Sequence, residues 1–335
     1  MPTTQILSTA GFNTALGIAK ESTYGTAVAP ATYVPFEDHN LTVKNKLIQN
    51  MAVRKSAGQP KPGIGTVEAS GSITTYVDAD TIGPILGAAL GADAVTGSSS
   101  YTHTMKLAFP LNSYTFSADD GQGSVSQYVG CKVNQMDISC KPDDFLKIKI
   151  DVLGQTDSVL SATSLSPTFS TKDFFEYAHL DSLNGGLGAS TLNGAAVNIV
   201  DFSIQLKNNL KAHYASTGGR FVVGMDEMNR DVTGSFTINY DSALADSVNL
   251  LLWGAATGPV AGLLSHVPLV FTFTQSVTSS ISITCPQITI EEAVISRKRN
   301  DILVQQVKFR ANESAIGAQD DLKIVLINQT AAAFV

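Results

Sequence analysis

The side chains that commonly perform acid–base, metal or phosphate chemistry are scattered along this chain of 335 residues. The five histidines stand one at a time, and none lies at metal-ligand spacing from another histidine or a cysteine. No serine lies in a GxSxG elbow, and the glycine-rich run NGGLGAS at 184–190 lacks the Lys-Ser/Thr of a phosphate loop. The sequence therefore predicts no catalytic site, no cofactor and no metal site, and we expect no enzyme.

Three acidic groups could in principle hold a cation. They are DADT at 78–81, DDGQG at 119–123, and the pair Asp226 and Glu227. None has oxygen ligands at the regularly spaced positions of an EF-hand loop. Helix capping or turn formation accounts for them more simply, because carboxylates at such positions accept hydrogen bonds from free backbone amides.

The clearest pattern is a repeated phrase. Residues 71–80 read GSITTYVDAD and residues 234–243 read GSFTINYDSA, an offset of 163 in a chain about twice that long. The same ungapped offset aligns Lys44-Asn45 with Lys207-Asn208. Beyond this block the offset becomes 157, which places Tyr114 against Phe271. Shared alternation could arise by coincidence, but shared polar identities favour a duplicated domain.

Strand signals dominate both halves, since apolar residues alternate with polar or small ones at period two. Each half has one apolar run with helical spacing, and Asp78 and Asp241 stand before these runs as predicted helix caps. Gly91 and Gly254 can end the helices, and Pro84 fits only in a first turn. We predict a mainly β fold of two tandem β-sandwich domains, 1–160 and 161–335, each with one flanking helix.

Composition excludes several classes of function. The net charge is −7 and no basic face stands out, so reading of nucleic acid by groove contacts is not expected. The start lacks a signal-peptide pattern and no apolar run is long enough to cross a bilayer, so we expect a soluble protein that stays where it is made. Cys131, Cys140 and Cys285 are expected to be free thiols, although a bridge between the first two is conceivable.

Four stretches of the chain resemble, in the right order, the tail tube (major tail) proteins of long-tailed bacteriophages. The most distinctive is LGIAKESTYGTAVAPATYVPFEDHNLTV at 16–43, which is similar to the N-terminal signature of that family. The others are ASGSITTYVDADTIGPILGAALG at 69–91, LNGAAVNIVDFSIQLKNNLKA at 192–212 and DLKIVLINQTAAAF at 321–334. The resemblance covers nearly the whole chain, and its motifs are structural.

The resemblance implies a structural protein of the virion tail, assembled in the host cytoplasm. Its rings would stack into the tube that conducts the DNA genome, with inner sheets of neighbouring domains joined into one ring-spanning β-barrel. Its partners would be itself, the tape-measure and tail terminator proteins, and DNA that slides through without specific contacts. Because the domain is duplicated, we expect trimeric, pseudo-hexameric rings; the alternative is six chains with the second domain outside. The lumen is expected to carry more carboxylates than basic groups, because phosphate binds basic walls.

The two long loops, 49–66 and 214–230, are predicted to bridge adjacent chains or rings. Their basic residues Arg54, Lys55, Lys61 and Arg220 would pair with acidic residues of a neighbour, next to Phe221. The alternative is a mobile, solvated hairpin.

Two other functions stay open on the sequence alone. A duplicated β-sandwich could be a binding module, such as an adhesin or a carbohydrate-binding protein, but aromatic residues are scarce (7%) for sugar stacking. A contact-dependent secretion tube shares the fold and is distinguished mainly by the N-terminal signature.

Overall fold

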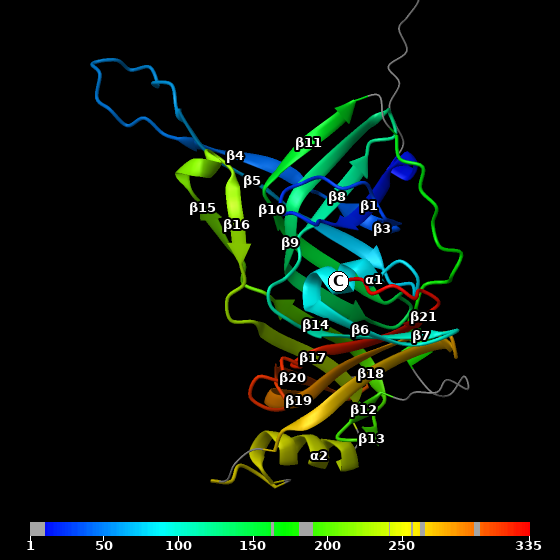
Figure 1. Ribbon diagram of the computed structural model, residues 1–335. Coiled ribbons are helices and arrows are strands. Elements are labelled where there is room, and N and C mark those ends of the chain that lie inside the picture. Colours follow the sequence, from blue (N-terminus) through cyan, green and yellow to red (C-terminus); the bar gives the residue numbers. More distant parts are fainter. Residues whose placement is uncertain are drawn as a thin grey trace, which may run out of the picture.

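The computed structural model describes residues 11–161, 164–180, 190–240, 242–255, 257–261, 265–297 and 302–335. Within these residues the chain is mainly β, as predicted (Figure 1). We call residues 11–161 the first half and residues 190–335 the second half.

The elements of the first half are a 3-10 helix (Gly11–Asn13), β1 (Ala15–Lys20), β2 (Thr32–Tyr33), β3 (Phe36–His39), β4 (Thr42–Ile48), β5 (Gly63–Tyr76), α1 (Gly83–Leu90), β6 (Gly91–Gly97), β7 (Tyr101–Leu107), β8 (Tyr114–Asp119), β9 (Ser124–Cys140), β10 (Lys147–Gly154) and β11 (Thr156–Ser161). A 3-10 helix (Tyr177–Leu180) follows. The second half contains β12 (Thr191–Leu192), β13 (Ala195–Ala196), β14 (Ile199–Lys207), β15 (Lys211–Tyr214), a 3-10 helix (Ser216–Gly218), β16 (Val222–Asp226), β17 (Asp231–Asn239), α2 (Ser242–Trp253), β18 (Val267–Ser276), β19 (Ser279–Ser296), β20 (Val304–Asn312) and β21 (Lys323–Asn328).

One antiparallel run of strands, which we call the long sheet, passes through both halves. Its order is β3 and β4, then β5, β10, the C-terminal part of β9, β14, β17, β20 and the C-terminal part of β19. The N-terminal part of β9 leaves this sheet to pair with β8 and β11, and the N-terminal part of β19 pairs with β18 and β21. Because both strands are long, each pairs with one set of strands along its N-terminal part and with another along its C-terminal part.

The core lies on one side of the long sheet. Successive side chains of a strand point to opposite faces, so Ile73, Ile138, Ile150, Phe236 and Val307 are all buried together in one contiguous apolar cluster. The side chains between them are polar and form the opposite surface, which we call the polar face. The alternation predicted from the sequence thus has a physical cause in the pleat of the strands.

The two halves pair their strands in the same register. Ile150 stands opposite Ile73 in the first half, and Val307 stands opposite Phe236 in the second, at the offsets of 157 and 163 found in the sequence. The β-bulges repeat as well: the extra residue of β9 is Asn134 and that of β19 is Glu291. Bulges re-aim a strand locally, so both halves bend their sheets at the same place.

The outer hairpins depart from the offset of 157. Tyr114 of β8 stands opposite Cys131, whereas Val267, not Phe271, stands opposite Ile288, the counterpart of Cys131. The expected match of Tyr114 with Phe271 is therefore wrong. The reason is hairpin length: the paired residues Tyr114 and Cys131 are 17 positions apart in the chain, whereas Val267 and Ile288 are 21 positions apart.

The glycine of the repeated phrase stands where neighbouring atoms come too close for a side chain. A Cβ at Gly71 would lie 2.6 Å from the Cα of Leu41, and one at Gly234 would lie 2.5 Å from the Cζ of Phe309. The serine that follows each glycine points to the polar face. The shared Gly-Ser pair therefore marks one crowded position beside one half-buried position on the polar face.

Both helices end as predicted, but α1 begins differently. Gly91 has φ 96° at the C-cap of α1, Gly254 has φ 80° after α2, and Pro84 lies in the first turn. The N-cap of α1 is Ile82, which makes no side-chain capping bond. Asp78 instead accepts hydrogen bonds from the amides of Asp80 (2.8 Å) and Thr81 (2.9 Å), because it closes the turn before the helix. Asp241, the other predicted cap, lies outside the described residues.

The three cysteines are free and buried, so the conceivable bridge between Cys131 and Cys140 is not formed. Burial raises the pKa of the Cys140 and Cys285 thiols to about 12. Since the thiolate is the reactive form, these side chains are inert packing residues in the folded chain.

Candidate functional site

The two halves meet through a strand pair in the middle of the long sheet. β14 lies antiparallel to β9, with Leu206 opposite Met136, Gln205 opposite Asp137 and Phe202 opposite Cys140. On the polar face the Gln205 amide donates to Asp137 Oδ1 at 2.7 Å. We call this contact the internal junction, and it makes the sheet continuous from one half to the other (Figure 1).

Asn208 anchors the end of the internal junction. Its side chain is fully buried, and its Nδ2 donates to the carbonyls of Ala89 (3.0 Å) and Val133 (2.9 Å). Ala89 lies in the last turn of α1, where helix carbonyls lack intrahelical partners. A single amide therefore ties β14 to both α1 and β9. Sequence reasoning had singled out the repeated Lys-Asn pair but had assigned it no role.

The long sheet ends in two open edges. No strand in the described part of the chain pairs with the outer side of β3 and β4, or with residues 292–296 of β19 on the side away from β20. Apolar side chains on these edges are exposed, among them Leu47 (57%), Ile48 (61%) and Val294 (49%). Unpaired edges of this kind are templates for pairing with another chain.

The second of the two predicted contact loops folds back on the first half. We call residues 211–230 the second arm; it contains the hairpin of β15 and β16. The Arg220 guanidinium donates to the Gly65 carbonyl and to Asn45 Oδ1, both at 2.9 Å, and Phe221 is partly exposed beside it. Arg220, predicted to pair with a neighbour's acidic residue, thus already has two neutral partners within its own chain.

A buried ion pair fixes the base of the second arm. Lys132 Nζ lies 2.9 Å from Glu227 Oε1 and 2.9 Å from the Met225 carbonyl, and the Leu111 amide donates to the same Glu227 oxygen. Both charged side chains are less than one tenth exposed. Asp226, in contrast, lies at the surface against His213. These two acidic residues therefore serve separate contacts and do not form a cation site.

The corresponding loop of the first half stands out from the molecule. We call residues 49–62 the first arm, which joins β4 to β5 and projects beyond the rest of the chain (Figure 1). Met51 and Val53 are 87% and 98% exposed. Arg54, Lys55 and Lys61 are also exposed, and none of them takes part in an ion pair among the described residues. The two arms thus occupy opposite states, one docked and one free.

Basic side chains on the polar face are mostly held by acidic neighbours. Lys308 lies 2.6 Å from Glu292, and Arg310 contacts both Asp231 and Glu291. The hydrogen bond with Glu291 raises the pKa of Arg310. Lys147 and Lys46 have carboxylate partners at 3.3 Å and 2.9 Å. Among the described residues, Lys44, Lys149 and Lys207 are the basic side chains of this face that have no ion pair.

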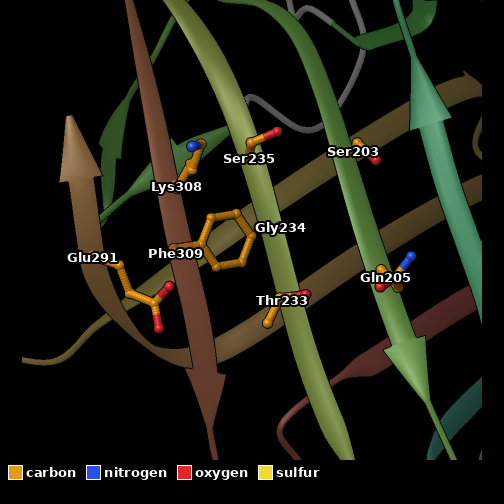
Figure 2. Close-up of a pocket in the computed structure, with 8 residues that line it drawn as sticks. All are labelled: Ser203, Gln205, Thr233, Gly234, Ser235, Glu291, Lys308 and Phe309. Carbon is orange, nitrogen blue, oxygen red and sulfur yellow. The ribbon is translucent and has the colours of Figure 1, made fainter. Parts of the chain in front are cut away.

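Part of the polar face forms a shallow hollow of about 300 Å³ over β14, β17 and β20 (Figure 2). It is lined by Ser203, Gln205, Thr233, Gly234, Ser235, Glu291, Lys308 and Phe309. Its hydroxyl groups have no histidine beside them that could act as a base, and the hollow is open to solvent. The lining can make hydrogen bonds but has no nucleophile paired with a general base.

The described residues thus form a sheet with open edges, one docked and one projecting arm, and a polar face on which no nucleophile is paired with a general base. The family model described as phage tail tube protein matches residues 11–322, nearly the whole chain. This chain belongs to the phage tail tube protein family. The match spans both halves, which confirms the resemblance found in the sequence. No curated protein matches the chain.

Family membership makes this tail tube protein a structural component of the virion tail that assembles with itself and other tail components. The described residues contain no group of three or more histidine, cysteine, aspartate or glutamate side chains able to hold a metal ion. Nor do they contain a helix that is both long and apolar enough to span a membrane.

Proposed function

We propose that three copies of this tail tube protein close into a ring around a central channel, and that stacked rings conduct the DNA genome during ejection. The internal junction is the observation that carries this proposal. The junction pairs β14 with the C-terminal part of β9 in a sheet whose two halves have the same strand pairing. The counterparts of these two strands, β4 and the C-terminal part of β19, form the open edges of the described sheet. Closing the ring gives every edge a partner and removes the risk of uncontrolled edge pairing.

The ring proposal assumes two tandem β-sandwich domains, residues 1–160 and 161–335, derived from one duplicated unit. The coinciding registers and bulges of the two halves support this division. Two equivalent domains per chain let one chain fill two positions of a closed ring. The inner sheets of three chains would then form one barrel with pseudo-sixfold symmetry.

The alternative of six chains, with the second domain outside the ring, is less compatible with this fold. In that arrangement the C-terminal part of β9 would pair with β3 and β4 of the next chain. That edge of β9 already carries β14 within the same chain. A sixfold ring would have to break the internal junction, including the buried bonds of Asn208.

The polar face would line the channel. Its strands carry nine carboxylates against seven basic side chains: Glu37, Asp38, Glu68, Asp137, Asp151, Asp201, Asp231, Glu291 and Glu292 against Lys44, Lys46, Lys147, Lys149, Lys207, Lys308 and Arg310. Unpaired lysines and arginines bind DNA by releasing counterions from its phosphates. A wall on which carboxylates outnumber the cations, and pair with four of them, would let DNA slide instead of stick.

The arms would bridge neighbouring chains or rings. The docked second arm shows which kind of surface an arm can cover, because it lies against strands of the preceding domain. The first arm would make the corresponding contact with another copy, where Arg54, Lys55 and Lys61 meet acidic residues. Tape-measure and tail terminator proteins would set the length of the tube, which would assemble in the host cytoplasm.

Electron microscopy of the purified protein at rising concentration tests the proposal. We expect rings and tubes with three chains per ring and a channel lined by both halves. Rings of six chains with the second half outside would show the stoichiometry to be wrong. A chain that stays monomeric at every concentration, and in the presence of the other tail proteins, would contradict the tube function itself.

A further inference from the structure

We propose that Asn45 is the residue that locks one chain to the next, by donating its side-chain amide to the carbonyls of Ile290 and Leu252 on the neighbouring copy. This inference rests on the ring proposed above and adds the register in which the edge strands of adjacent chains pair. It follows from treating the internal junction as a template for the contact between chains.

The template is the set of bonds around Asn208. Its amide reaches Val133 at the bulge of β9 and Ala89 in the last turn of α1. Its backbone amide donates to the Asn134 carbonyl at 2.8 Å. These bonds close the strand pair at the end where β14 leaves β9.

Each member of this set has a counterpart at an open edge. The registers of the two halves place Asn45 at the position of Asn208, Ile290 at that of Val133, and Leu252 at that of Ala89. The Asn45 side of the contact lies on the open edge at β4. The Ile290 side lies on β19, next to the bulge residue Glu291.

The helix that must supply the second carbonyl is correctly placed. α1 packs against β9, and α2 packs against β19 in the second half. Leu252 stands one residue before the end of α2, as Ala89 does in α1. Carbonyls in the last turn of a helix need partners from outside it, so an incoming amide finds an acceptor.

The same mapping fixes which residues face each other between chains. Gln205 opposite Asp137 becomes Thr42 opposite Val294, and Lys207 opposite Gln135 becomes Lys44 opposite Glu292. Lys44 is exposed in the single chain, and among the described residues Glu292 forms an ion pair with Lys308 alone. Directly opposed side chains of opposite charge stabilise an antiparallel pair, so this register is electrostatically favourable where the template has a neutral glutamine.

Asn45 is also free to act as a donor. In the single chain it is exposed, and its Oδ1 accepts a hydrogen bond from Arg220. Its two amide hydrogens point to no partner among the described residues. Arg220 of the second arm therefore orients the Asn45 side chain while leaving its donors available. Asn208, by comparison, has a buried Oδ1 without a partner.

Matched substitutions separate the two asparagines. Asn45→Asp keeps the acceptor that Arg220 uses but presents a carboxylate to two carbonyls. We expect this variant to keep the melting temperature of the single chain and to raise the concentration needed for ring formation about tenfold or more. Asn208→Asp is the control, and it should lower the melting temperature of the single chain itself because its site is buried.

Disulfide trapping tests the register without relying on stability. Under mild oxidation we expect Thr42→Cys with Val294→Cys to link chains, as Asp137→Cys with Gln205→Cys should link within one chain. Thr42→Cys with Ser296→Cys, two residues out of register, should not link, because diagonal Cβ atoms lie about 7 Å apart. The native thiols are buried and should not interfere.

The outcomes are distinct. Efficient linking of the in-register pair, together with normal folding and impaired assembly of Asn45→Asp, would support the clamp. Rings that form normally from Asn45→Asp, or that link through residues 42 and 296 instead, would overturn it and leave the tube function intact. Absence of any ring from the unmodified chain would remove the proposed function as well.

Discussion

The two halves of this tail tube protein pair their strands alike but leave their surfaces in different states. In the first half every residue of α1 is buried and the edge of β9 carries β14. In the second half Leu250 of α2 is 49% exposed and the end of β19 has a free side. The difference teaches that burial depends on the neighbour a surface has, because the first half is covered by the second, whereas no described strand covers the end of β19.

The C-terminal segment shows how thoroughly the first half is covered. Phe334 lies over Gly83 and Gly87 of α1, where a Cβ at Gly83 would be 2.3 Å from its ring. The Tyr114 hydroxyl donates to the Phe334 carbonyl, and His103 joins Asp93 to the Thr330 carbonyl. The end of the second half thus seals the helix of the first.

Comparison of the arms gives the largest expected effect. Glu227→Gln leaves the buried Lys132 ammonium without its charge partner, so the free energy of unfolding should fall by about 3–5 kcal/mol. Deleting residues 54–62 of the exposed first arm should leave the stability of the single chain almost unchanged and abolish polymerisation. Urea denaturation and electron microscopy measure the two effects.

Two outcomes would contradict this comparison of the arms. Tubes of normal length from the deletion would show that the first arm does not bridge copies. An unchanged unfolding midpoint for Glu227→Gln would show that the second arm is not held by the ion pair. Lys132→Met combined with Glu227→Gln is the control, since removing both charges should recover much of the loss.

A second comparison concerns equivalent core positions. Phe309 and Val152 stand opposite Gly234 and Gly71, and both are buried. Phe309→Ala should cost about 3–5 kcal/mol because it removes a large ring and leaves a cavity. Val152→Ala should cost about 1–3 kcal/mol because fewer buried atoms are lost. Equal losses in chemical denaturation would show that the number of buried atoms removed does not set the cost at these two positions.

The smallest expected effect is a pH dependence specific to the first half. Burial lowers the pKa of His39, whose Nδ1 has no partner, whereas Phe202 fills the equivalent place in the second half. Below about pH 6.5 the unfolded chain binds a proton that the folded chain resists, so stability falls as the pH drops toward the folded-state pKa. We expect His39→Phe to lose less stability than the unmodified chain between about pH 7.5 and about pH 5.5. Parallel denaturation curves for both chains would contradict this.

Much of the fold could be predicted because its signals are local. Period-two alternation predicted the strands, and Gly91, Gly254 and Pro84 marked the helix ends because they restrict the backbone whatever surrounds them. Asp78 was misplaced because a turn before the helix uses the same carboxylate chemistry as a cap. The match of Tyr114 to Phe271 failed because the β18–β19 hairpin is longer than the β8–β9 hairpin by an even number of residues, which shifts the register without changing the alternation.

The candidate site could be predicted less well from the sequence. Arg220 was singled out, but its partners, Gly65 and Asn45, lie more than 150 residues away in the chain. The roles of Lys132 and Asn208 left no local signal except the repeated Lys-Asn pair. Contacts of this kind depend on which edges meet in space, and composition does not encode that.

By itself, the sequence determined the mainly β fold, the repeated phrase and the family, since side-chain alternation and backbone restrictions act within a few residues. Only the tertiary structure decided that β14 covers β9, that one arm docks while the other projects, and that Asn208 is buried while Asn45 is exposed. The two asparagines follow the same Lys in similar strands, yet one has a partner strand and the other has none. Their environments differ because hydrogen bonds and burial at a sheet edge are supplied by the neighbouring strand, which lies far away in the sequence.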